Sequence, residues 1–428
     1  MGTFLTVSFI VLMILGTPIW AVLSASSFIS LNFASTTPLL VVSQRMFTAV
    51  DATALLAIPL FMIAGNLMQG GGISRRLINF CDALLGSITG GLGMVAILAC
   101  MFFAAISGSG PATVAAIGGI MIPEMERAGY DKKFSTALMC VAGGIGVVIP
   151  PSIPMVNVGI AGSVSISSLF AAGFLPGILI GVALMTVCYY SAKKFGYGTG
   201  NNKVFSWRNL WIQFKDAFWA LLMPIIILGG IYGGIFTPTE AAGVSVIYGF
   251  IIGCFVYKEI KLKDIVPMFL AATKSTAMVM MIIACASGFG WILTAERIPD
   301  AIAKAIISLS GNKIVILLLI NLLLLFVGCI METTASIIIL TPIFMPIITK
   351  LGVNPIHFGI IMVVNLAIGM STPPLGVNLF VGCGISKTTI EDVFKPLMPF
   401  LIANIIALLL ITFFEPISMV IPRMMGIQ

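Results

Sequence analysis

Two apolar stretches of this chain are interrupted in the same way, 223 residues apart. Residues Gly144–Pro151 read GIGVVIPP and residues Ala367–Pro374 read AIGMSTPP, and each follows a polar break, SGSGPAT from Ser107 or METTAS from Met331. A gapless shift by 223 also superposes Pro123/Pro346, Gly129/Gly352, Gly159/Gly382, Ser163/Ser386 and Pro176/Pro399. Unrelated apolar helices would not share helix breakers at these spacings. Paired, interrupted segments indicate a transporter whose binding site is built from broken helices.

Composition places most of the chain in a membrane. Charged residues make up 9% of the chain and apolar residues 59%, whereas a soluble domain carries about 25% charged residues. A helix needs about 20 apolar residues to cross about 30 Å of hydrocarbon, so the sequence predicts an all-α polytopic membrane protein. The candidate spans lie near residues 4–23, 53–69, 90–106, 135–149, 168–192, 217–236, 240–257, 266–290, 313–328, 357–370 and 394–414. The first span lacks a basic leader and is interpreted as a retained helix.

Basic residues in the predicted connections indicate the orientation. The residues concerned are Lys193, Lys194, Lys203, Arg208 and Lys215 in one connection and Lys258, Lys261 and Lys263 two spans later. Two crossings return the chain to the same side, which the positive-inside rule assigns to the cytoplasm. The net charge of +7 is therefore explained by loops, and no nucleic-acid partner is expected. The eight cysteines are scattered singly, without the spacing of a metal or redox motif.

The period of 223 residues contains an odd number of predicted crossings, so the second copy should be inserted upside down relative to the first. The expected first half is residues 1–195, with a re-entrant hairpin near 95–130. The expected second half is residues 217–428, with a hairpin near 313–350. Aromatic residues at helical spacing in the connection, residues 196–216, predict a helix that lies flat on phospholipid headgroups.

Free backbone groups at the breaks predict cation sites. Irregular backbone at membrane depth is tolerated only where it lines a protein cavity, and each Pro-Pro pair leaves carbonyls of the preceding turn without donors. Carbonyl and hydroxyl oxygens are hard ligands that suit Na⁺. We expect two or more Na⁺ sites, with ligands from Ser107, Gly144, Val147 and Pro150 in one repeat and from Gly328, Ala367, Met370 and Pro373 in the other. The alternative is a pair of simple proline kinks.

The same breaks predict a site for an anionic substrate. Helices that begin near Pro111 and Thr334 would direct their N-terminal amides at a carboxylate. Glu332 is the only acid in a hairpin tip, where an unpaired charge is costly, so it is either functional or a chance interfacial acid. The predicted substrate-binding residues are Ser109, Ser152, Asn157, Glu332, Thr334, Thr372 and Asn378. Glu240 and His357 are interpreted as structural, and Arg45 and Lys274 as cations that face lipid or a partner.

Five longer strings resemble one family. They are PLFMIAG from Pro59, GISRR from Gly72, IPPSIPM from Ile149, GGIYGGIFTPTEAA from Gly229 and HFGIIMVVNLAIG from His357. These strings resemble the large membrane (M) subunit, the DctM-like component, of TRAP (tripartite ATP-independent periplasmic) transporters. The resemblance covers nearly the whole chain.

The resemblance implies Na⁺-coupled uptake of a carboxylate-bearing organic acid, of the C4-dicarboxylate or sialic acid type, across the bacterial inner membrane. It implies an elevator-type transporter in which two inverted-topology repeats, with re-entrant hairpins and broken helices, slide against a scaffold. The implied partners are a small four-helix membrane subunit (Q type) and a periplasmic solute-binding protein (P type). No organic cofactor is expected.

Two other classes of function remain as alternatives. A membrane-embedded hydrolase would use Ser109 or Glu332, but the sequence supplies neither a base for a nucleophilic serine nor a second intramembrane acid opposite Glu332. We therefore expect no enzyme activity. A passive channel would differ from a carrier in its turnover.

Overall fold

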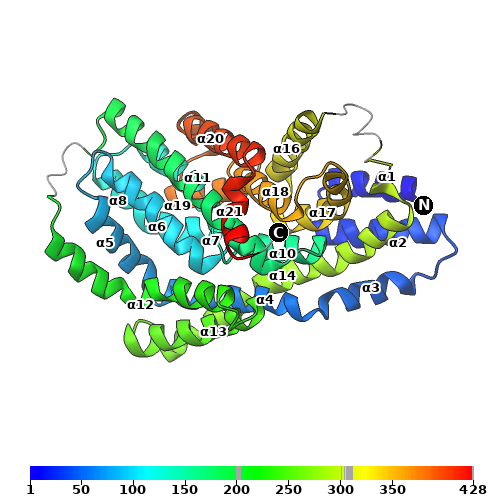
Figure 1. Ribbon diagram of the computed structural model, residues 1–428, viewed down its shortest axis with the longest axis horizontal. Coiled ribbons are helices and arrows are strands. Elements are labelled where there is room, and N and C mark those ends of the chain that lie inside the picture. The colour runs from blue at the N-terminus through cyan, green and yellow to red at the C-terminus, as the bar shows by residue number, and fades with distance from the viewer. Residues whose placement is uncertain (199–203, 300, 303, 305–311, 427–428) are drawn as a thin grey trace.

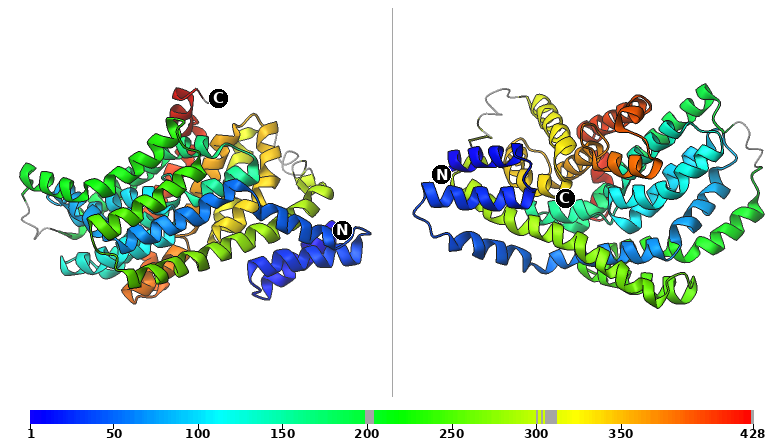
Figure 2. Two further views of the ribbon diagram at one scale, coloured as in Figure 1. Left: turned by 90° about the horizontal axis from the view of Figure 1, so that it is seen from below. Right: turned by 180° about the vertical axis from the view of Figure 1, so that it is seen from behind.

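The structure, a computed structural model, consists of helices in two layers (Figure 1). It describes residues 1–198, 204–299, 301, 302, 304 and 312–426. In Figure 1 one layer follows a long edge of the elongated molecule, from α1–α3 at one end to α12–α13 at the other, and the view from behind in Figure 2 agrees. We call this layer the scaffold layer and the helices packed against it the inner body.

The scaffold layer comprises α1 (Gly2–Ile14), α2 (Ile19–Ala34), α3 (Leu40–Val50), the 3₁₀ turn η1 (Thr53–Leu56), α4 (Ala57–Gly70), α12 (Trp207–Tyr232), α13 (Pro238–Ile251), the π turn η4 (Ile252–Val256) and α14 (Leu262–Ala295). Helix α5 (Ile73–Leu85) packs on both α12 and α6, and so joins the layers. The inner body comprises α6 (Gly91–Ser107), α7 (Gly110–Thr113), the π turn η2 (Val114–Gly118), α8 (Gly119–Arg127), α9 (Lys132–Gly143), the 3₁₀ turn η3 (Gly144–Val147), α10 (Ile153–Gly162), α11 (Ile166–Phe195), α16 (Lys313–Ile330), α17 (Thr333–Lys350), α18 (Pro355–Gly369), α19 (Val377–Ser386), α20 (Ile390–Phe413) and α21 (Pro416–Met424).

The helix boundaries repeat with the period of the sequence. The first hairpin is α6 followed by α7–α8, and adding 223 to its bounds gives 314–330 and 333–350, the second hairpin, α16 and α17, to within one residue. The packing is reciprocal, because α10 packs on α17 while α19 packs on α7, η2 and α8. Such exchanged contacts between equivalent elements indicate a two-fold relation. Among the described residues, the chain crosses between the two hairpins through α9–α10, α11, α12, α13 and α14. This odd number gives the inverted orientation that the sequence predicts.

Local sequence explains where these helices start and end. Asp131 caps α9 by accepting a hydrogen bond from the N–H of Phe134 at 2.9 Å. Thr237 and Glu240 form a reciprocal capping box at the start of α13, which confirms the structural interpretation of Glu240. Gly108 takes the left-handed conformation (φ 59°) that ends α6 and turns the chain into the hairpin tip.

The prediction of one continuous helix over residues 4–23 is wrong. Helix α1 ends at Ile14 and α2 begins at Ile19, and the two pack against each other as a hairpin. The turn between them contains Gly16 with φ 73° and Pro18, which caps α2. Proline removes an amide donor and fixes φ, so the apolar run cannot continue as one helix through this point.

The predicted boundary between residues 216 and 217 is also wrong. Ser206 caps a helix that starts at Trp207 and runs to Tyr232. Its one proline, Pro224, lies beyond residue 217, so no proline interrupts the helix at the predicted boundary. Residues 207–216 of the predicted connection are therefore the first part of α12. Residues 199–203, which include Asn201 and Lys203, lie outside the described residues. The position of the connection on phospholipid headgroups stays a prediction.

The basic loops gather at one end of the inner body and scaffold layer. Gly71 after α4 lies against Gly253 of η4, close to the loop that carries Lys258 and Lys261, and Gly90 before α6 lies against Ala192 near the end of α11. By the positive-inside rule this face is cytoplasmic. The opposite face carries the end of α14, the end of α10 and the start of α16, and we call it the outer face.

Arg76 of α5 fixes this helix to the scaffold layer on the cytoplasmic face. Its guanidinium pairs with Glu259 at 2.5 Å and with Asp216 at 3.4 Å, and it lies 3.8 Å from the ring centroid of Tyr257. Arg76→Met should lower the free energy of unfolding by about 1–2 kcal/mol, because the ion pairs and the cation–π contact are lost together. Thermal unfolding in detergent measures this change. Lys132→Met, which breaks only the exposed pair with Glu126 at 3.9 Å, is the control and should have almost no effect.

Candidate functional site

The first broken helix ends in a tight turn. Helix α9 passes into η3, the chain then runs through the cis pair Pro150-Pro151, and α10 starts after Ser152. The hydroxyl of Ser152 accepts from the N–H of Met155 at 3.3 Å and donates to the carbonyl of Val147 at 2.5 Å. Ser152, predicted to bind substrate, thus caps α10. The carbonyl of Val147, a predicted Na⁺ ligand, already accepts one hydrogen bond.

The first hairpin tip packs onto this break. Ser107 is buried, and its hydroxyl lies 3.0 Å from the hydroxyl of Thr113. Gly146 lies against Thr113 and the carbonyl of Ser109, and leaves no room for a Cβ atom. The structure therefore brings Ser107 and the Gly144–Val147 turn together, as predicted, and adds Thr113. This cluster of hydroxyl and carbonyl oxygens has the ligand chemistry that Na⁺ prefers.

The second break repeats the arrangement. Helix α18 ends at Gly369, the pair Pro373-Pro374 is again cis, and α19 starts at Val377. Gly328, near the end of α16, touches Gly369, and a Cβ atom on Gly369 would lie 2.6 Å from the Cα atom of Gly328. Two predicted Na⁺ ligands of this repeat, Gly328 and Met370, thus lie at one backbone crossing, next to Gly369.

The two breaks touch each other at the centre of the inner body. Gly144 lies against the carbonyl of Ala367, and the hydroxyl of Ser371 donates to the carbonyl of Cys140 at 2.8 Å. The amide of Asn378 donates to the same carbonyl at 3.2 Å. Gly144 and Ala367 were assigned to separate sites in the sequence, yet they share this contact. Carbonyl and side-chain oxygens of both repeats are therefore gathered in one buried region.

The remaining predicted substrate residues fall into two groups. Thr372 donates to the carbonyl of Ile368 at 2.7 Å. Glu332 is half-buried and caps α17 by accepting a hydrogen bond from the N–H of Ala335 at 3.1 Å. Both residues therefore have local structural partners. Asn157 lies 3.4 Å from Thr334 across the two repeats. The Oδ1 atoms of Asn157 and Asn378 are buried and have no hydrogen-bond partner among the described residues.

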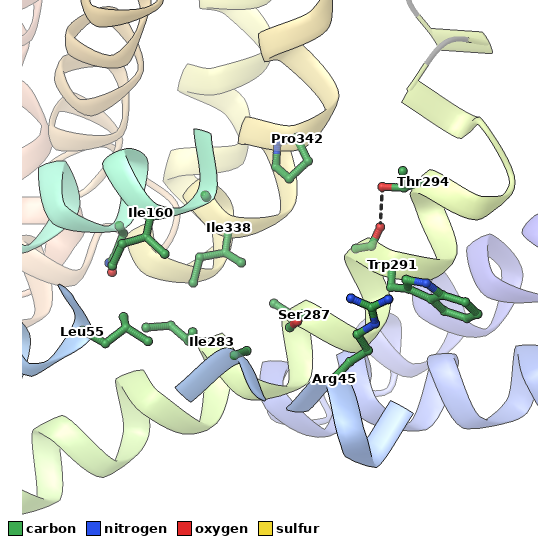
Figure 3. Close-up of a pocket in the computed structure, with 14 residues that line it drawn as sticks. Arg45, Leu55, Ile160, Ile283, Ser287, Trp291, Thr294, Ile338 and Pro342 are labelled. Atoms are coloured by element: carbon green, nitrogen blue, oxygen red, sulfur yellow. Dashed lines mark hydrogen bonds between the residues drawn. The ribbon is translucent and has the colours of Figure 1, made fainter. Parts of the chain in front are cut away.

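Several cavities lie between the scaffold layer and the inner body, and one of about 540 Å³ lies between η1, the start of α13 and the loop from α10 to α11. Two others are lined by residues of the hairpins. The outer cavity, of about 410 Å³, is enclosed by α3 and the second half of α14 on one side and by α10 and α17 on the other (Figure 3). The inner cavity, of about 80 Å³, lies between α4, the first half of α14 and the first hairpin tip with Ser107 and Ser109. Ala49 and Ala272, which are 223 residues apart, line equivalent walls. The cavities are thus symmetry-related in position and unequal in size.

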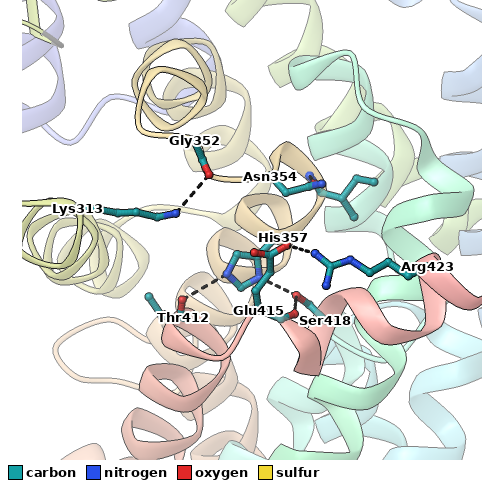
Figure 4. A network of polar contacts seen from close by, with 9 residues as sticks. Lys313, Gly352, Asn354, His357, Thr412, Glu415, Ser418 and Arg423 are labelled. Atoms are coloured by element: carbon teal, nitrogen blue, oxygen red, sulfur yellow. Dashed lines mark hydrogen bonds and ion pairs between the residues drawn. The ribbon is translucent and has the colours of Figure 1, made fainter. Parts of the chain in front are cut away.

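A polar network closes the second repeat at the outer face (Figure 4). The ring of His357 lies 2.6 Å from the hydroxyl of Ser418 and 3.3 Å from the carbonyl of Thr412. Glu415 pairs with Arg423 at 2.6 Å nearby. His357 therefore has structural partners on both ring nitrogens, which agrees with its interpretation as a structural residue.

Comparison with known proteins identifies the chain. Residues 6–417 match the family described as "Tripartite ATP-independent periplasmic transporter, DctM component". The chain belongs to this family. It is a large permease subunit of the TRAP type, a multi-pass protein of the inner membrane and not an enzyme.

Curated relatives are similar over nearly the whole chain. The isethionate TRAP transporter permease protein DctMQ of Oleidesulfovibrio alaskensis is 48% identical over 95% of this chain, which spans 64% of that protein's length. The C4-dicarboxylate TRAP transporter large permease protein DctM of Rhodobacter capsulatus is 37% identical over 97% of this chain and 98% of its own length. The sialic acid TRAP transporter large permease protein SiaM of Vibrio cholerae is 37% identical over 89% of both chains.

A solved structure shares the fold. The YdaH transporter of Alcanivorax borkumensis, whose crystal structure was described as having an unusual topology, superposes with a TM-score of 0.65 over 97% of this chain and 100% of that chain. Its sequence is 16% identical, so the likeness concerns the fold alone.

Sequence reasoning missed three residues of this region. Thr113 stands inside the first quoted motif, four residues after Ser109, and Ser371 stands inside the second, directly after Met370. At each position a hydroxyl can reach the break. Arg45 lines the outer cavity rather than only facing lipid, and no sequence pattern singled it out. Lys274 lines neither cavity.

Gly369→Ala should separate the second hairpin from its break, because the added Cβ atom meets the backbone of Gly328. Backbone cannot move aside as a side-chain end can, so we expect a loss of about 2–3 kcal/mol in the free energy of unfolding. Thermal unfolding in detergent measures it. Gly384→Ala in α19, where a Cβ atom meets nothing within 4 Å, is the matched control and should be neutral or slightly stabilising. Equal melting temperatures for both variants would contradict the packing described here.

Proposed function

We propose that this subunit couples the uptake of an organic anion to Na⁺, with ion sites at the two breaks and an elevator movement of the inner body against the scaffold layer. The observation that carries the proposal is the buried meeting of the breaks, where Gly144 touches Ala367 and Ser371 bonds to Cys140.

Cation binding is supported by the chemistry of the breaks. Ser107, Thr113 and the η3 turn supply hydroxyl and carbonyl oxygens in a buried region, and no cluster of three His, Cys, Asp or Glu side chains is present among the described residues. Such neutral oxygen ligands favour a hard monovalent cation over a transition metal. Neutral ligands also avoid the cost of a permanent charge at membrane depth.

The elevator movement is supported by the two unequal cavities. The two cavities occupy equivalent positions, but the outer cavity measures about 410 Å³ and the cytoplasmic one about 80 Å³. Alternating access requires such a difference between the two sides. Both cavities have one wall from the scaffold layer and one from the inner body. Sliding of one layer past the other would therefore close one cavity as it opens the second.

The substrate and partners follow from the relatives. Their names give C4-dicarboxylates, sialic acid and isethionate, which are all organic anions. Apart from Glu332, the predicted site uses neutral hydrogen-bonding groups and helix N-termini that suit an anion. We include a sulfonate beside the two carboxylate classes for this reason. A small Q-type subunit and a periplasmic P-type binding protein complete the proposed transporter, and the name DctMQ of a longer relative agrees with this.

The coupling is tested by uptake into proteoliposomes that contain this chain, its small subunit and its binding protein. Solute should accumulate only under an inward Na⁺ gradient. Ser107→Ala should raise the Na⁺ concentration for half-maximal uptake by about five- to tenfold, because one hydroxyl ligand is lost. Ser8→Ala, which removes a hydroxyl that bonds to its own helix in α1, is the control. Uptake that persists without Na⁺ would refute the coupling, and an unchanged Na⁺ dependence in Ser107→Ala would remove this site.

Glu332→Gln separates charge from helix capping. Glutamine keeps an oxygen that accepts from the N–H of Ala335, so α17 should stay capped. If the carboxylate acts in transport, the ratio kcat/KM for uptake should fall about tenfold with an unchanged melting temperature. Glu332→Ala, which loses both charge and cap, should also melt earlier. Wild-type uptake by Glu332→Gln would leave Glu332 as a cap only.

A further inference from the structure

Arg45 is the only charged residue among the described residues that line the outer cavity. It lies on α3 of the scaffold layer, with its guanidinium carbon 5.9 Å from the centroid of the Trp291 ring on α14. Figure 3 shows the guanidinium beside Trp291, with Ser287 and Thr294 on the same wall. In the described part of the chain no carboxylate lies within ion-pair distance of Arg45. The cation–π contact with the indole holds the guanidinium at the cavity wall and leaves its N–H groups available to a ligand.

Arg45 lies away from the basic loops, which gather on the opposite, cytoplasmic face, as the positive-inside rule requires. Other cations of the outer half, such as Lys313 and Arg423, do not line the outer cavity. A lone cation at the wall of a low-dielectric cavity raises the local concentration of anions there. Both Arg45 and Lys274 are exposed, but Lys274, on the same helix as Trp291, lines neither cavity and so offers a contrast.

The opposite wall of the cavity supplies an acceptor. Asn157 of α10 is 1% exposed, lines the cavity, and its Oδ1 atom has no hydrogen-bond partner among the described residues. A buried acceptor without a donor costs about 1–3 kcal/mol, and a ligand hydroxyl would satisfy it. Arg45 belongs to the scaffold layer and Asn157 to the inner body, so one ligand held by both would bridge the two layers.

We propose that the outer cavity is the first binding site for the solute, where Arg45 holds its carboxylate or sulfonate group and Asn157 accepts a hydrogen bond from its hydroxyl. The inference rests on the proposed function and narrows it to hydroxylated organic anions. Arginine is suited to this task because its planar fork donates two parallel hydrogen bonds to such a group.

Binding can be measured without transport. The wild-type chain in lipid nanodiscs is titrated with isethionate, ethanesulfonate, N-acetylneuraminate, succinate and the uncharged analogue succinamide, while tryptophan fluorescence is recorded. Anions should change the emission of Trp291 in a saturable way and succinamide should not. Isethionate should bind about tenfold more tightly than ethanesulfonate, which lacks the hydroxyl. Trp291→Phe should remove the signal and so assign it.

Two variants test the role of Arg45. Arg45→Gln should weaken anion binding at least tenfold and raise KM for uptake by a similar factor with kcat within twofold, whereas Arg45→Lys should keep part of the affinity. Lys274→Gln, with the same charge change on α14, should leave both unchanged.

The outcomes separate this inference from the proposed function. Wild-type affinity and KM in Arg45→Gln, or no titration of the wild-type chain by any of these anions, would overturn the inference while Na⁺-driven uptake stands. Equal affinities for isethionate and ethanesulfonate would overturn the role of Asn157. Uptake by the wild-type transporter that does not depend on Na⁺ would instead refute the proposed function, whatever Arg45 binds.

Discussion

The structure depends on one constraint, which is that an unpaired backbone carbonyl cannot face hydrocarbon. Each Pro-Pro pair lacks the amide donors that these carbonyls would need. In the fold, both breaks are buried against each other and against the hairpin tips. Glycines make this possible, because Gly328 and Gly369 allow two backbones to approach where any Cβ atom would collide. The hairpins, the reciprocal packing of α10 on α17 and of α19 on α7–α8, and the enclosing scaffold layer all follow from this central contact.

The same contact links the architecture to its chemistry. Groups that hold the breaks together, such as the hydroxyls of Ser107 and Ser371, are also the oxygen atoms that a hard cation would use. A cation at this point would bind oxygen atoms from both repeats and so tighten the inner body as a unit. A rigid inner body is what a sliding movement against a separate layer needs, since the ion sites must travel intact.

Much of this could be predicted from the sequence, and the reasons are physical. Prolines and glycines act locally, so the breaks at Pro150 and Pro373 and both hairpins could be placed to within a few residues. Hydropathy averaged over a window hid the turn at Gly16 to Pro18, although the local signal was present. The contact between Gly144 and Ala367 and the place of Arg45 in a cavity wall could not be predicted, because each depends on how separate helices pack and neither leaves a periodic trace in the chain.

Helix α14 has a further consequence. This single helix of 34 residues forms part of the wall of both cavities, with Ser287 at the outer one and Ser275 at the inner one. At a rise of about 1.5 Å per residue these positions are roughly 18 Å apart along the axis. In the proposed movement, α14 stays in place while the inner body slides along it. The spacing of the two cavities along this one helix would therefore set the distance that the solute moves.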